Sequence, residues 1–174
     1  MGKSNEMPTP PAHWTDIRPQ VVPNRRDNPA DTAGGWPDFT LPDGQKLKDV
    51  IQRHRSELLD TVERLQTYPE SADGGLGYAT GHYLSMAWPH GALDFKNRFK
   101  GRGNATDLGK AGNFAYYAIG AGILPDAVLD AGASAYNLYK TLTGQNMDHS
   151  NPFGPDKSAQ TVRDHALTYG MRLK

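Results

Sequence analysis

Two short segments of the chain carry side chains that could act together in chemistry. The first, "PHGALDFKNRFKGRG" at residues 89–103, contains His90, Asp94 and Lys96, which can transfer protons or hold negative charge. The second, "GNFAYYAIG" at residues 112–120, places Asn113 and Tyr116 three positions apart, so a helix would present both on one face. An amide and a phenol in that arrangement can stabilise charge that develops during a reaction.

The first segment is also the basic part of the chain that carries aromatic side chains. Its lysines and arginines alternate with two phenylalanines, a pattern that can hold phosphates and stack a base, although a solvated charged loop would look the same. The residues predicted to bind substrate are Arg98, Lys100 and Arg102.

Glycines surround the second segment. Each costs roughly 1 kcal/mol against alanine if it is helical, so their presence indicates close backbone packing or a bend. Close packing would bring Asn113 and Tyr116 near Asp94 and Lys96, which predicts a shared catalytic site. A buried amide and phenol that only satisfy local backbone would leave the same pattern.

Residue types in the chain also suggest two other kinds of site. His82, His90 and Asp94 could hold a metal, but their spacing matches no established ligand pattern, and the sequence predicts neither metal nor cofactor. Glu57 or Glu63 could serve as the acid of a glycan-cleaving enzyme, yet arginines lie among them, which favours a solvated helix face.

Composition limits the class of protein. The 174 residues suit one domain, and equal numbers of acidic and basic residues exclude the overall positive charge of a general nucleic-acid binder. Cysteine is absent, which excludes disulfides and thiolate chemistry. No apolar run suits a signal peptide or a membrane span, so any export is expected to use another route, from the cytoplasm.

The elements expected to position these residues are helical. Apolar residues recur at helical spacing from an Asp43 cap to about Pro69, and further helices are predicted at 76–88, 107–123, 126–143 and 158–170, with loops at 70–75 and 90–106. The prediction is a mainly α fold: one compact domain of about five helices at 43–174. Eight of the thirteen prolines fall in residues 1–42, which predicts a preceding arm or linker that Trp14 and Trp36 could pin to the domain.

Four short segments between residues 88 and 171 form a further ordered pattern. Their residues are Pro89, Gly91, Asp94 and Lys96, then Gly112, Asn113, Phe114, Tyr116 and Gly120, then Leu129, Ala131 and Gly132, and finally Ala166, Leu167 and Gly170. In order and in spacing these segments resemble the bacterial polymorphic toxin type 44 domain.

The resemblance implies an interbacterial toxin, delivered into a target bacterium and neutralised in its producer by a cognate immunity protein. The arm would then bind a secretion-system carrier or adaptor. Ala115 stands where members of the family often carry histidine, a natural acid–base group, so this form either is inactive or uses His90 instead.

A hydrolase that attacks RNA or another nucleic acid without a metal is the activity favoured at this point. Lys96 and Arg98 would hold phosphate, Asp94 would orient or accept a proton, and Asn113 with Tyr116 would stabilise charge. The alternatives are a peptidoglycan hydrolase and, from a different class, a non-enzymatic adaptor or immunity-type binding module.

Overall fold

The computed structural model describes residues 35–67, 72–143 and 157–173. The fold in this part of the chain is mainly helical, as predicted, and without a β-strand, since only two isolated bridges occur. The elements are the 3-10 turn η2 (Trp36–Asp38) and the helices α2 (Leu47–Thr67), α3 (Ala72–Ala87), α4 (Phe95–Arg98), α5 (Ala105–Gly120), α6 (Asp126–Leu142) and α7 (Lys157–Arg172).

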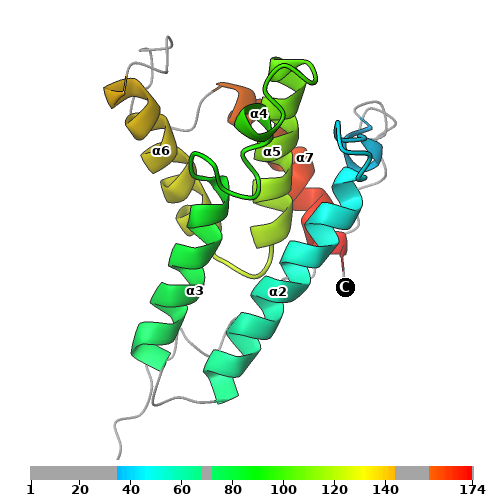
Figure 1. The fold of residues 1–174 in the computed structure, drawn as a ribbon. Helices are drawn as coiled ribbons and strands as arrows, with labels where there is room; N and C mark the ends of the chain where they lie inside the picture. The colour runs from blue at the N-terminus through cyan, green and yellow to red at the C-terminus, as the bar shows by residue number, and fades with distance from the viewer. Residues whose placement is uncertain (1–34, 68–71, 144–156, 174) are drawn as a thin grey trace, which may run out of the picture.

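Helix α5 lies at the centre of the arrangement (Figure 1). It packs along α7 and also contacts α2 and α3. Helix α6 meets α5 through side chains, since the Tyr116 hydroxyl of α5 donates to the Leu129 carbonyl oxygen of α6. Between Ala111 and Ala121 every residue of the chain except Asn113 is buried. The apolar core therefore forms around one glycine-containing helix, and the elements that pack on α5 take their positions from it.

Close approach explains why α5 and α7 contain glycine. A Cβ atom added at Gly112 would lie 2.6 Å from the carbonyl oxygen of Leu93, so the loop before α4 rests directly on the α5 backbone. A Cβ added at Gly170 of α7 would lie 2.2 Å from the carbonyl oxygen of Ala118 in α5. Both distances are far below van der Waals contact. The cost of glycine in a helix is therefore offset by backbone contacts that no other residue allows.

A buried arginine closes the end of α5. The last carbonyls of a helix have no partner within the helix, and a positive charge there also complements the helix dipole. Arg55 of α2 supplies both: its Nη1 donates to the carbonyl oxygens of Ile119 at 3.0 Å and Ala121 at 2.7 Å, with a longer contact to Ala118 at 3.4 Å. Its Nη2 reaches the carbonyl oxygen of Leu173, just after α7, at 3.4 Å. One side chain thus ties three helices together.

Some predicted boundaries differ from the observed ones. The loop predicted at 70–75 is wrong from Ala72 onward, because α3 begins there. Helix α5 begins at Ala105, two residues before the predicted start at 107, because the Asn104 side chain accepts hydrogen bonds from the next turn at 2.9 Å and 3.2 Å. Asp43 accepts a hydrogen bond from the Gln45 amide within a turn and does not cap α2.

The described part of the predicted arm, from Gly35, packs on the helices. Leu41 is buried in the core, and Trp36 lies partly buried against it, 5.7 Å from Phe39 between ring centroids. Trp14 and the rest of residues 1–34 lie outside the described residues.

Candidate functional site

A cleft of about 710 Å³ opens between the end of α3, the α4 segment, α5 and α6. Its volume is in the range of sites that hold small molecules and cofactors. Four predicted catalytic residues line it, as does one predicted substrate-binding residue. The five are Asp94, Lys96, Lys100, Asn113 and Tyr116.

Helix α5 forms the floor of this cleft. Gly109 and Gly112 lie on the lining face of the helix and carry no side chain, and Asn113 follows them on the same side. Because Gly112 lets the Leu93 backbone approach, the α4 segment lies directly beside Asn113. Gly109 and Gly112 therefore leave the floor of the cleft without side chains, and Gly112 also sets how closely the α4 segment approaches α5.

One wall of the cleft is cationic. Lys96 in α4 and Lys100 in the turn after it are exposed, and neither pairs with a carboxylate within the residues that the structure describes. Lys140 of α6 adds a third ammonium group to the lining. Among the described lining residues Asp94 is the one acidic side chain. Charge in the cleft is therefore strongly biased toward binding anions.

Asp94 holds the loop together by accepting hydrogen bonds. Its Oδ2 accepts from the backbone N–H of His90 at 2.8 Å and from the side-chain amide of Asn97 at 2.7 Å, and its Oδ1 contacts the Asn97 N–H at 3.4 Å. The residue is only 7 % exposed and caps α4. Its geometry is that of a carboxylate that shapes the cationic wall.

Replacing Asp94 by alanine is therefore expected to lower stability by about 1–3 kcal/mol, since a helix cap and buried backbone partners are lost together. Urea unfolding followed by circular dichroism measures the loss. The Asp94→Asn variant keeps one acceptor oxygen and should recover part of it. A variant that loses activity at unchanged stability would contradict this role and favour the predicted catalytic one.

Tyr116 is similarly engaged. Its hydroxyl donates to the carbonyl oxygen of Leu129 at 2.9 Å, and its own carbonyl oxygen accepts the hydroxyl of Tyr83, whose ring stacks on it at 5.1 Å. Burial raises the pKa of Tyr116 well above its ordinary value, and the nearby Tyr117 and Asp130 act in the same direction. The phenol is thus a protonated donor that holds α6 against α5, with part of its ring facing the cleft.

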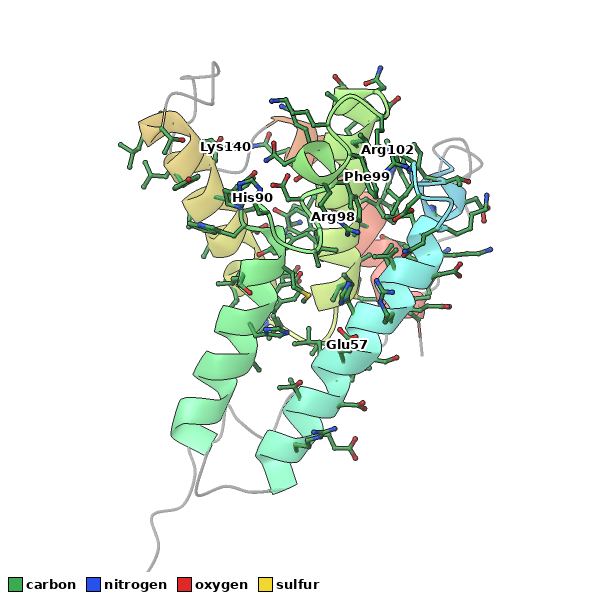
Figure 2. All side chains as sticks on the ribbon, in the orientation of Figure 1. Glu57, His90, Arg98, Phe99, Arg102 and Lys140 are labelled. Carbon is green, nitrogen blue, oxygen red and sulfur yellow. The ribbon has the colours of Figure 1, made fainter. Side chains whose placement is uncertain are left out.

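Two predicted substrate-binding arginines support the loop from outside the cleft. The Nη1 of Arg98 donates to the Ala92 carbonyl oxygen at 2.7 Å, and its guanidinium lies 5.2 Å from the Phe99 ring centroid. Arg102 donates to the Pro42 carbonyl oxygen at 3.2 Å. Figure 2 shows Arg98, Phe99 and Arg102 on the side of the α4 segment that faces α2. Neither arginine lines the cleft.

Two other predicted catalytic positions also lie outside the lining. His90 is exposed on the loop between α3 and α4, in the left-handed backbone region at φ 67°, and Figure 2 shows it on the α6 side of that loop. Ala115 is completely buried in the core and does not reach the cleft. A histidine at position 115 would therefore enter the packed interior, and its imidazole would not face the other predicted site residues.

An aromatic wall opposite the lysines of the α4 segment was missed by the sequence reasoning. Trp88, just after α3, and Tyr136 of α6 line the cleft with ring centroids 6.0 Å apart. The Nζ of Lys140 lies 4.9 Å from the Tyr136 ring centroid, one helical turn along α6. Two features of the sequence could have indicated this wall. Tyr136 and Lys140 are four positions apart, so a helix places them side by side, and Trp88 stands at a helix end, directly before Pro89.

The alternatives weighed on the sequence have no counterpart in the cleft. Within the described residues no group of three or more His, Asp or Glu side chains lies close enough to hold a metal ion. Glu57 pairs with His54 of the same helix at 2.8 Å, on α2 and outside the cleft. In the same part of the chain, no helix combines the length and apolar character that crossing a membrane requires.

Comparisons of the chain with protein-family models, with curated proteins and with solved structures found no match. The fold and the cleft therefore define the class by themselves: a helical domain whose cleft is lined by three lysines and by the rings of Trp88 and Tyr136.

Proposed function

We propose that this chain is an effector domain of the polymorphic toxin kind that binds and hydrolyses nucleic acid, RNA in the first instance, in the cleft between α4, α5 and α6. One observation carries the proposal. Three lysines line the cleft against a single carboxylate, and that carboxylate is occupied by hydrogen bonds. A polyanionic substrate has the complementary charge.

RNA suits this cleft because its cleavage can proceed without a metal. The 2′-hydroxyl gives its proton to a base and attacks the adjacent phosphorus, the bond to the 5′-oxygen breaks as that oxygen takes up a proton from an acid, and a 2′,3′-cyclic phosphate remains. The lysines would stabilise the added negative charge, and Asn113 would orient the phosphate. His90 is exposed on the loop beside the cleft but outside its lining, so it would act as the acid–base group on a substrate that extends past the cleft edge, since Ala115 supplies none.

The cell-wall alternative receives less support from the described residues. A cell-wall hydrolase needs a carboxylic acid that faces its substrate, whereas Glu57 lies outside the cleft and Asp94 accepts hydrogen bonds within the loop. A binding module without activity shares the charge pattern of the cleft, and cleavage of bound RNA is the observation that distinguishes it from the proposed hydrolase. The proposed toxin would be delivered into a target bacterium through a carrier bound to its N-terminal arm and held inactive in the producer by an immunity protein.

The test replaces Lys96 and Lys100 by glutamine, singly and together. Each change is expected to weaken RNA binding on the order of 10-fold at low salt and to reduce the salt-dependence slope by about 1, because one phosphate contact is lost. Fluorescence anisotropy with labelled RNA measures both quantities, and gel analysis of the same samples follows cleavage.

Arg53→Gln is the matched control, since it removes one positive charge from an exposed position of α2 outside the cleft. Binding unaffected by both lysine changes, or equally weakened by the control, would refute the proposal. Growth arrest only after export to the periplasm, with none in the cytoplasm, would instead support the cell-wall alternative.

A further inference from the structure

The two walls of the cleft differ in chemistry in a way that bears on the form of the substrate. The wall built from the α4 segment carries Lys96 and Lys100, which bind charge. The opposite wall carries the rings of Trp88 and Tyr136, which bind flat apolar surface. A ligand that fills the cleft must therefore present anionic groups on one side and a ring face on the other.

Trp88 is the residue of the aromatic wall that best indicates the kind of ligand. Its side chain is 38 % exposed although it is the largest side chain at the site, and it lies in the cleft lining. It meets the rings of Tyr136 and Tyr139 at tilted angles, 54° and 45°, so these neighbours do not cover it as a parallel stack would. Part of a large indole face is therefore left accessible in the cleft, beside the Tyr136 ring, where a flat ring could stack on it.

A nucleotide has the required two-sided chemistry. Its phosphate would lie against the ammonium groups of Lys96 and Lys100, and its base would lie against the indole. Lys140 sits over the Tyr136 ring at 4.9 Å and adds a charge at the same end of the aromatic wall, where the next phosphate of a strand could bind. The volume of about 710 Å³ is adequate for one nucleotide and part of its neighbour.

We infer that the cleft takes single-stranded nucleic acid, with one base turned out of the strand and stacked on Trp88. The inference rests on the proposed function and specifies its substrate class. Bases inside a duplex have both faces covered by their neighbours, so a duplex offers phosphates to the lysines but nothing to the aromatic wall. The combination of both walls selects the single strand.

The experiment measures binding of a short single-stranded RNA and of a hairpin of equal charge, whose stem is closed by a non-nucleotide linker so that it has no loop bases, to the full chain. The wild-type protein is expected to prefer the single strand. Trp88→Ala is expected to weaken single-strand binding by about 5- to 150-fold, the equivalent of ~1–3 kcal/mol for one base–aromatic stack, and to leave hairpin binding nearly unchanged. Trp88→Phe retains a ring and should recover most of the loss.

Fluorescence provides a readout that a purely structural role would not change. In a protein with Trp14 and Trp36 changed to phenylalanine, Trp88 is the remaining tryptophan, and stacking should quench its emission on addition of a nucleoside monophosphate or of the single strand. Tyr136→Leu, which keeps an apolar side chain at the same wall, is a second variant with an expected smaller loss of affinity.

The outcomes separate this inference from the proposed function. Lysine-dependent RNA binding that is equal for strand and hairpin and insensitive to Trp88→Ala would overturn the inference and leave the proposed function standing. RNA binding that is absent from the wild-type protein under all salt conditions would overturn both. Single-stranded DNA bound as tightly as RNA would support the stacking and move the substrate from RNA to single strands in general.

Discussion

Replacing Arg55 by leucine is expected to lower the free energy of unfolding by about 3 kcal/mol or more. Leucine keeps apolar contacts but leaves the carbonyl oxygens of Ile119 and Ala121 buried without the partner that Arg55 supplies, and each such group costs ~1–3 kcal/mol. The loss corresponds to a melting temperature lower by roughly 6–12 °C for a chain of this size. Thermal and urea unfolding followed by circular dichroism measure it.

Arg53→Leu is the matched control for this prediction, because Arg53 lies on the same helix but is exposed. It should change stability by no more than about 0.5 kcal/mol. Arg55→Lys keeps the positive charge with fewer donors, so it should fall between the wild type and Arg55→Leu. Equal stability of Arg55→Leu and Arg53→Leu would show that the observed hydrogen bonds contribute nothing.

The second large effect is expected at Gly170, where alanine should destabilise by about 3 kcal/mol. Its Cβ would lie 2.2 Å from the Ala118 carbonyl oxygen and 2.7 Å from the Ala121 Cβ, and neither atom can rotate away, so α5 and α7 must separate. Overpacking of this kind typically costs 1–3 kcal/mol and occasionally more. The change should lower the melting temperature without altering the helix content at low temperature.

A glycine with open space beside it provides the control, because alanine there should raise the free energy of unfolding and not lower it. Gly81 lies in α3, and a Cβ added there meets nothing within 4 Å. Gly81→Ala should therefore stabilise the protein by up to ~1 kcal/mol through helix propensity alone. If both alanine variants moved stability in the same direction, close packing of α5 on α7 would not be the reason for the glycine at 170.

The sequence predicted the helices well where their apolar periodicity is strong, as in α2, and where glycine marks a contact, as in α5. It also predicted that Asp94, Lys96, Asn113 and Tyr116 would share one region, because residues three apart on a helix face the same way and glycine implies a close neighbour. The sequence alone could not distinguish side chains that face the cleft from side chains whose hydrogen bonds stabilise the segments around it.

That distinction depends on partners far along the chain. Tyr116 is engaged by the Leu129 carbonyl oxygen, and Arg102 by that of Pro42, sixty positions away. Backbone acceptors carry no signature in the sequence, so a tethered polar side chain and a free one look alike. Trp88 and Tyr136 were missed for the same reason, since only the fold brings the end of α3 beside α6.

Arg55 also has a consequence for the route by which the chain folds. Its carbonyl partners lie 63 to 118 positions away in the sequence, so the contacts that close the core join the first long helix to the middle and the end of the described chain. Helical proteins usually fold fast because most of their contacts are local. A contact between distant residues requires a long loop to close, and the entropy lost in closing it precedes the stabilisation that the contact brings. Arg55 reaches all of its partners only after α5 and the end of α7 have come together, so we expect this set of hydrogen bonds to form late in folding.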